Sequence, residues 1–141
     1  MNIEFKFELN GINWLEAADV FKRAPLGVRD PAKLCRSWEN SFLVCFAFDA
    51  DKLIGMGRAI SDGEYQAVIY DLVVLPEFQY KGIGNQIMRE LQKRLPVETI
   101  ILYAVPGKEA FYEKLGYSKM LTAMAKKTKE EENFRLSGYI K

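Results

Sequence analysis

The chain contains no histidine, and this absence excludes several kinds of active site. Ser–His–Asp and Cys–His catalysis both need an imidazole as the general base. Zinc sites built on histidine are excluded with them, and the two cysteines, Cys35 and Cys45, are too few for a structural zinc site. We therefore expect no metal, and we expect acid–base chemistry to rest on carboxylates, tyrosine, lysine or bound water.

The scarcity of cysteine and the lack of long apolar runs bear on location. Two cysteines without CxxC spacing are most simply interpreted as reduced thiols in the cytosol. The first residues, MNIEFKFELN, lack the basic start and apolar core of a signal peptide. No apolar run approaches the roughly 20 residues that span a bilayer. We expect a cytoplasmic protein with no membrane partner.

Neither sign of charge is in excess. Twenty basic residues face nineteen acidic ones, for a net charge of +1, which argues against a dedicated nucleic-acid binder. The chain of 141 residues has no internal repeat and no low-complexity linker. We expect residues 1–141 to form a single domain.

The hydrophobic pattern predicts a mixed α/β domain. Helices are expected at residues 13–22, 31–38, 84–95 and 108–115. Strands are expected at residues 3–9, 41–50, 53–61, 67–75 and 99–105, with two more at 117–127 and 134–140 on either side of a charged loop. A helix lies between the fourth and fifth strands, so these two strands should be parallel.

A glycine pair stands where the apolar run ending at Leu75 passes into a predicted helix. The stretch reads QYKGIG, residues 79–84. The first turn of a helix has unpaired N–H groups, and glycines there let an anion approach them without meeting a Cβ. The alternative is a tight turn that binds nothing. The spacing matches neither the Walker loop nor the dinucleotide fingerprint.

Two sequence blocks together resemble one family. Gln79-x-x-Gly82-x-Gly84 after an apolar strand looks like the acetyl-CoA-binding motif of the GNAT superfamily of N-acetyltransferases. The block KEAFYEKLGY, residues 108–117, is similar to the AxxFYxKxGF-like block of that superfamily, although alanine and phenylalanine are adjacent here and Tyr117 replaces the commoner phenylalanine. Both blocks occur in the family's order, and the element order agrees over almost the whole chain.

The resemblance implies a fold and a function. The fold would be a GNAT α/β fold with a twisted sheet of about six to seven strands, strands 4 and 5 parallel and splayed, and about four flanking helices. The function would be transfer of an acetyl group from acetyl-CoA to a primary amine of a small molecule or protein, by direct attack on the thioester. The alternative is a non-catalytic module that binds or senses acyl-CoA. The resemblance further implies that the protein is a monomer or a homodimer.

The resemblance also implies where acetyl-CoA binds. The pantetheine arm is expected along the backbone of strand 4, at Leu72, Val73 and Val74. The pyrophosphate is expected on the loop formed by Gln79, Tyr80, Lys81, Gly82, Ile83 and Gly84. Phe111 and Lys114 would flank the other side of the cofactor. An asparagine that often follows strand 5 in this family is absent, because residues 103–106 read YAVP.

Two residues are candidates for catalysis. Tyr112 matches the family tyrosine whose hydroxyl lies near the thioester sulfur, so it is the expected acid; the alternative is a packing role. Asp71 is a carboxylate within an apolar strand, where a charge needs a role or a partner. Asp71 would bind the acceptor amine or relay its proton, and the alternative is a pair with a neighbour such as Arg58. In this family the first two helices wall the acceptor site.

Overall fold

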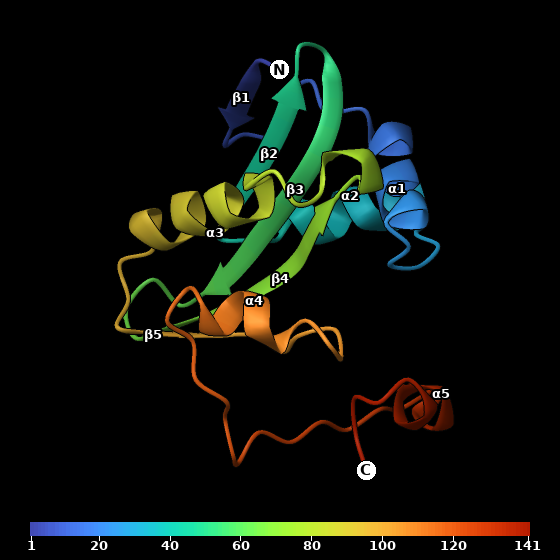
Figure 1. Cartoon of the computed structure of the whole chain (residues 1–141), viewed down its shortest axis with the longest axis vertical. Helices are drawn as coiled ribbons and strands as arrows, with labels where there is room; N and C mark the ends of the chain where they lie inside the picture. Colours follow the sequence, from blue (N-terminus) through green and yellow to red (C-terminus); the bar gives the residue numbers. More distant parts are fainter. The chain divides into compact units, whose positions relative to one another are not determined.

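The computed structural model describes all 141 residues, which pack as two compact units, residues 1–102 and 103–141. The elements of the first unit, in chain order, are β1 (Ile3–Lys6), α1 (Trp14–Arg23), α2 (Pro31–Glu39), β2 (Leu43–Asp49), β3 (Lys52–Ser61), β4 (Gln66–Val74), the 3₁₀ turn η1 (Pro76–Phe78), α3 (Ile83–Arg94) and β5 (Thr99–Ile101) (Figure 1). The second unit contains α4 (Glu109–Glu113) and α5 (Glu131–Leu136).

A single five-stranded sheet runs in the order β1-β2-β3-β4-β5. Neighbouring strands are antiparallel except β4 and β5, which are parallel and joined by α3. The β4–β5 pairing covers only residues 66–68 against residues 99–101. From Ile69 to Val74, the edge of β4 that faces away from β3 therefore has no strand partner. The mixed sheet and the parallel, splayed strands 4 and 5 are as predicted.

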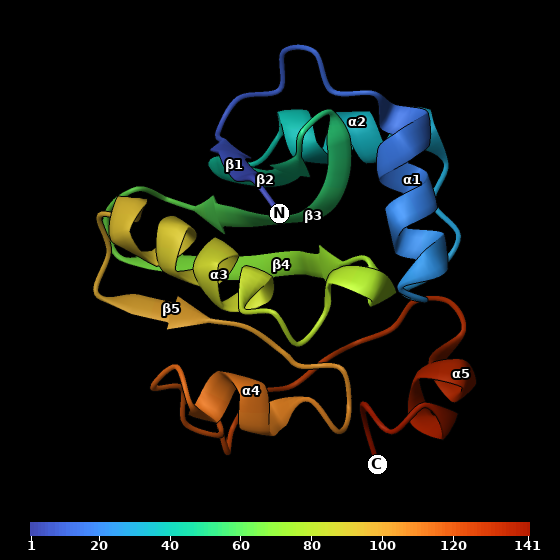
Figure 2. The ribbon, with the colours of Figure 1, turned by 45° about the horizontal axis from the view of Figure 1, so that its top comes forward.

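Helices cover both faces of this sheet, with α3 on one face and α1 and α2 on the other (Figure 2). On the α3 face, Gly55 and Gly57 of β3 lie directly beneath Ile87, so the helix approaches the sheet closely. On the opposite face, the ring of Trp38 lies 5.0 Å from that of Phe46, centre to centre. Phe21 and Trp38 on one face and Ile87 and Leu91 on the other are completely buried, and side chains of this kind give the first unit its core.

The helix starts follow from capping residues. Asn13 Oδ1 accepts hydrogen bonds from the backbone N–H groups of Leu15 and Glu16, and α1 begins at the next residue. Asp30 caps α2 through Lys33 N, and a proline occupies the first position of that helix. These local signals are sufficient to start a helix, and so both starts were predictable from sequence.

The number of strands is lower than predicted, five rather than six or seven. Strand β5 ends at Ile101 instead of Val105, and residues 117–127 form no strand. The side chains of Leu121 and Met124 are 95% and 97% exposed. An alternating apolar pattern forms a strand only where a neighbouring strand and a packed face receive it, and this segment has neither.

Residues 134–140 were also predicted as a strand, and the prediction is wrong. Helix α5 covers residues 131–136. Two glutamates lie in its first turn, and Arg135 pairs with Glu132 at 2.8 Å and with Glu131 at 3.9 Å. Such (i, i+3) and (i, i+4) pairs stabilise a helix and are unavailable to a strand. The ring of Phe134 then stacks on that of Tyr139.

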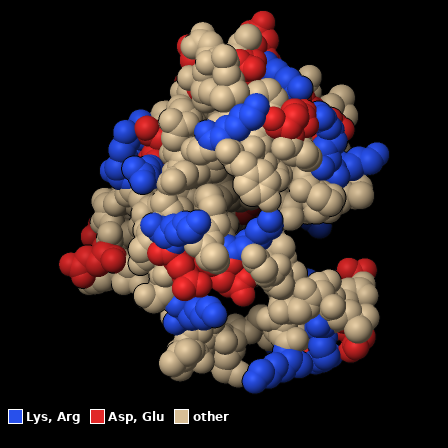
Figure 3. Space-filling model, viewed as in Figure 1, with Lys and Arg blue, Asp and Glu red and all other residues tan.

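Charge is mixed on the surface. On the face drawn in Figure 3, basic and acidic side chains are interspersed, and neither sign forms one extended area. No helix has the length and apolar character that crossing a membrane requires.

The close approach of α3 to β3 generates a stability prediction. A Cβ at Gly55 would lie 3.1 Å from the carbonyl oxygen of Val73, whereas the atoms nearest to a Cβ at Gly57 all belong to side chains, with those of Ile87 and Leu91 at 3.1 and 3.2 Å. Backbone yields less than side chains do. We expect Gly55→Ala to lower the free energy of unfolding by about 1–3 kcal/mol and Gly57→Ala by clearly less. Urea titrations followed by circular dichroism measure both values, and equal midpoints would contradict the argument.

Candidate functional site

The loop between β4 and α3 presents backbone N–H groups that have no acceptor. The first hydrogen bond of α3 runs from Gln86 N to Gly82 O, and no side chain caps the helix. The N–H groups of Ile83, Gly84 and Asn85 therefore remain unpaired at the positive end of the helix dipole. A Cβ at Gly82 would have no atom within 4 Å, so the space in front of these groups is open. This arrangement suits an anion.

Two left-handed residues and one side chain set the shape of the loop. Tyr80 and Gly82 have φ values of 62° and 82°. Gly82 adopts this conformation freely, whereas Tyr80 is a non-glycine residue in a sparsely populated region and its side chain is 95% exposed. Gln79 Nε2 donates a 2.9 Å hydrogen bond to Val74 O, which ties the loop to the end of β4. Lys81 is exposed, with Nζ 5.7 Å from the centre of the Phe78 ring.

The free edge of β4 carries backbone groups that point away from β3. Leu75 N donates to Ile54 O across the strand pair. Directions alternate along an antiparallel strand, so the backbone of Val73 faces β3 and that of Val74 faces the open side. The Gln79 bond to Val74 O agrees with this direction. The N–H of Val74 is therefore available at the open edge, next to the glycine loop.

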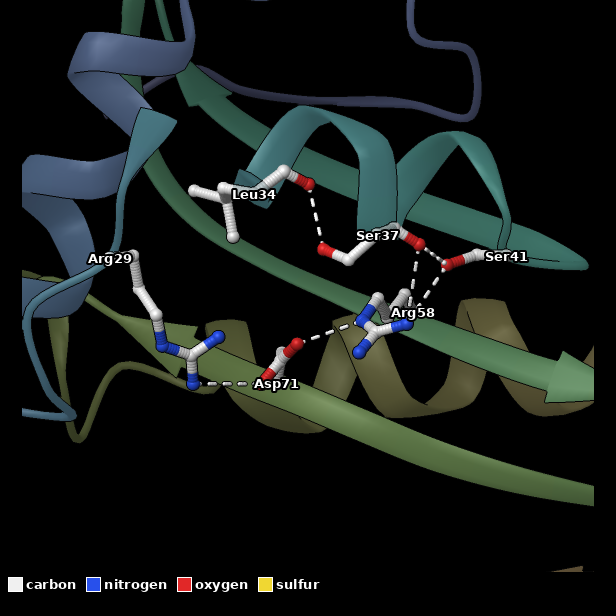
Figure 4. A network of polar contacts seen from close by, with 6 residues as sticks. All are labelled: Arg29, Leu34, Ser37, Ser41, Arg58 and Asp71. Carbon is white, nitrogen blue, oxygen red and sulfur yellow. Dashed lines mark hydrogen bonds and ion pairs between the residues drawn. The ribbon is translucent and has the colours of Figure 1, made fainter. Parts of the chain in front are cut away.

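Asp71 lies at an irregularity of β4. Its φ is 57°, and the β3–β4 register shifts between Met56 and Arg58. This bulge directs the Asp71 side chain toward the face that carries α1 and α2 (Figure 4). Its carboxylate is only 12% exposed and receives a different arginine on each oxygen. Oδ2 accepts from Arg58 Nε at 2.8 Å, and Oδ1 accepts from Arg29 Nη2 at 3.2 Å.

Arg58 joins three elements around Asp71. Besides its bond to Asp71, its Nη1 donates to Ser37 O at 3.4 Å and to Ser41 Oγ at 3.2 Å, at the end of α2 (Figure 4). Its side chain is 14% exposed. The pairing of Asp71 with Arg58 that the sequence left open is therefore present. The part played by Arg29 was missed, because a residue in an irregular loop leaves no periodic signal.

The second unit holds the remaining candidates. Phe111 and Tyr112 belong to α4, with ring centres 5.0 Å apart and nearly perpendicular planes. Burial raises the pKa of Tyr112 above its usual value of 10. The neighbouring Tyr117 has its pKa raised to about 12, mainly by burial and also by the proximity of Tyr112. Lys114 is exposed at the end of α4. Both phenols therefore stay protonated at neutral pH.

The structure thus groups the predicted residues within each unit. The first unit brings together Asp71, the β4 segment 72–74 and the loop 79–84, which are consecutive along one strand edge and the following turn. The second unit brings together Phe111, Tyr112 and Lys114. These groups can bind an anion, pair with an extended amide chain and donate a proton.

Comparison with known proteins gives a family match. Residues 40–119 match the family model described as acetyltransferase (GNAT) domain. The uncharacterized N-acetyltransferase ycf52 of Porphyra purpurea is 42% identical over 48% of this chain and 41% of its own length. A chloroplastic protein of Oryza sativa subsp. japonica, serotonin N-acetyltransferase 2, is 34% identical over 71% of this chain and 54% of its own length. The chain thus spans about half, or less, of these curated relatives.

A solved structure has the same fold. A GNAT-family acetyltransferase from Streptococcus pneumoniae TIGR4 superposes with a TM-score of 0.78 over 92% of this chain and 100% of that chain, at 22% sequence identity.

The unequal burial of the two arginines generates a stability prediction. We expect Arg58→Met to lower the free energy of unfolding by about 1–3 kcal/mol, because Asp71 and Ser41 then lose a partner inside the protein. We expect Arg29→Met to cost about 1 kcal/mol or less, since Arg29 is 35% exposed and water can replace it. Urea unfolding of the two variants side by side tests this order. Equal losses would show that Arg58 is not the main support of Asp71.

Proposed function

The chain belongs to the GNAT family of acetyltransferases, and from that premise we propose that it transfers the acetyl group of acetyl-CoA to a primary amine of a small molecule or protein. The observation that carries the proposal is the row of unpaired N–H groups at the start of α3, next to the unpaired edge of β4. The name of the rice relative, serotonin N-acetyltransferase, supports an amine acceptor.

The residues present fit acetyl-CoA. The loop from Gln79 to Gly84 would hold the pyrophosphate on backbone N–H groups, with Lys81 adding a positive charge. The β4 segment 72–74 would pair with the amides of the pantetheine arm, as an added strand does. Phe111 and Lys114 would flank the cofactor. The bound cofactor supplies an acetyl thioester, and Val74 is the residue we assign to polarise its carbonyl, because Val73 is engaged with β3.

Tyr112 is the group we assign as the acid. In the overall reaction a nitrogen–carbon bond forms and the carbon–sulfur bond breaks, and the departing thiolate takes one proton. A phenol whose pKa lies above 10 is fully protonated at neutral pH and can donate to that sulfur. Tyr117, next to it, has a buried hydroxyl without a hydrogen-bond partner in the protein. It therefore offers a matched comparison.

Asp71 is the group we assign to the acceptor amine. A free aliphatic amine has a pKa near about 10, so most of it is protonated and unreactive at neutral pH. A fixed carboxylate can hold the ammonium form in place and pass its proton to water. Arg58 and the bulge hold the Asp71 carboxylate in one position, which is the property such a group needs.

An amine panel tests the proposed activity. Tyramine, putrescine and a lysine-containing peptide are incubated with acetyl-CoA, and release of the free thiol is measured. Release that depends on the amine is the expected result. Tight acetyl-CoA binding without release for any amine would favour the alternative, a non-catalytic acyl-CoA-binding module.

Replacing Gly82 tests the anion site. Asparagine and aspartate tolerate positive φ better than other non-glycine residues, and the position is open, so Gly82→Asp and Gly82→Asn should both fold at a similar small cost in stability. The negative charge of the aspartate should lower the affinity for CoA by more than about tenfold, because it stands at the N–H groups that would hold the pyrophosphate. The uncharged Gly82→Asn adds a side chain of the same size, so it is the matched control for bulk and should lose less affinity than Gly82→Asp. Calorimetric titration with CoA measures both, and an affinity equal to that of the wild type in both variants would remove the loop from the site.

Replacing Tyr112 tests the acid. We expect Tyr112→Phe to lower kcat by about 100-fold with little change in the affinity for acetyl-CoA. Tyr117→Phe should keep kcat within about threefold, which serves as the control for a lost buried phenol. Because burial raises the pKa of Tyr112 above 10, titration of this acid should not reduce wild-type kcat below about pH 10. Unchanged kcat in Tyr112→Phe would leave the residue a packing role only.

A further inference from the structure

The two arginines that hold Asp71 are not equivalent. Arg58 makes hydrogen bonds to three residues and is 14% exposed, so its position is fixed by β3 and by the end of α2. Arg29 makes one longer hydrogen bond, to Asp71 Oδ1, and is 35% exposed. Its guanidinium otherwise contacts the ring of Phe21, 4.3 Å from the ring centre. Oδ1 is thus the oxygen with the weaker and more accessible partner.

The loop that carries Arg29 has no regular structure. Residues 24–30 connect α1 to α2, and the loop is anchored at Leu26, whose N donates to Phe21 O, and at Asp30, which caps α2. Between these anchors, Gly27 has a φ of 109° and Val28 is 88% exposed. Arg29 can therefore leave Asp71 without breaking a hydrogen bond of any helix or strand.

The charges around Asp71 decide what else can bind there. Two guanidinium groups and one carboxylate leave one net positive charge. A carboxylate oxygen can accept a second hydrogen bond, but an ammonium ion placed on Oδ1 beside Arg29 would meet a like charge within a few ångströms. Withdrawal of Arg29 removes this repulsion and makes the cluster neutral. An ammonium ion and Arg29 therefore compete for the same oxygen.

We propose that Arg29 occupies the position of the acceptor's ammonium group on Asp71, and that an acceptor binds by displacing it. Arg29 is then a specificity-determining residue, since only an amine that reaches Oδ1 and replaces the guanidinium gains the full interaction. The inference rests on the proposed function, which assigns the acceptor amine to Asp71.

The kinetic test separates the amine from the cofactor. Because Arg29 competes with the amine for Asp71, it raises the apparent KM for the amine. The factor equals the inverse of the fraction of protein in which Asp71 Oδ1 is accessible. Because the Arg29 side chain is 35% exposed and makes one hydrogen bond to Asp71, we expect Arg29→Gln to lower the KM for tyramine about fivefold. The kcat and the KM for acetyl-CoA should stay within about twofold of wild type. Arg29→Lys keeps the charge and should stay near the wild-type KM. A KM for tyramine in Arg29→Gln that is unchanged or raised overturns the inference.

A second measurement does not depend on turnover. The Arg29 side-chain Nε–H signal, identified in ¹⁵N NMR spectra by its loss in Arg29→Gln, should shift when tyramine is added at saturation, and the Arg58 signal should stay in place. If tyramine is acetylated and the Arg29 signal does not move, the inference is wrong while the proposed function stands. If no amine is acetylated and no amine moves the signal, both are wrong.

Discussion

The early end of the β4–β5 pairing is the constraint on which the rest of the structure depends. Only three residue pairs join the two parallel strands, and beyond Val68 the edge of β4 has no partner strand. A row of backbone groups left open inside a sheet needs a partner. Gln79 supplies one of these partners by bonding to Val74 O, and the same bond places the glycine loop at the end of the open edge. The open edge of β4 and the position of the glycine loop, which are the two features proposed to hold acetyl-CoA, thus both depend on the early end of the β4–β5 pairing.

The bulge at Asp71 is a second irregularity of β4. A left-handed residue in a strand costs free energy, and here two arginines and the neighbouring elements hold it in place. The same bulge turns the carboxylate to the face that carries α1 and α2. One irregularity of β4 therefore separates the proposed cofactor side from the proposed acceptor side. Arg58 binds Asp71 Oδ2 more closely than Arg29 binds Oδ1, so Oδ1 is the oxygen on which we propose that the acceptor amine replaces an arginine.

The sequence predicted the elements whose signals are local. Asn13 and Asp30 cap their helices through hydrogen bonds within three residues, and Gly82 marks the loop because its backbone is left-handed, with a φ of 82°. The segments at 117–127 and 134–140 were predicted wrongly as strands, because a strand depends on a neighbour elsewhere in the chain. In the second segment, pairs between glutamate and arginine one turn apart favoured a helix over the alternating apolar pattern.

By itself the sequence determined the order of elements in the first unit, the glycine loop and the two motifs that identify the family, since each depends on residues close together in the chain. The tertiary structure alone decided how far β5 follows β4, which backbone group of residues 72–74 is open, and which side chains surround Asp71. Arg29 and Asp71 are 42 residues apart. No local pattern encodes such a pair, because it arises only when the fold brings the loop that carries Arg29 next to the bulge in β4 that carries Asp71.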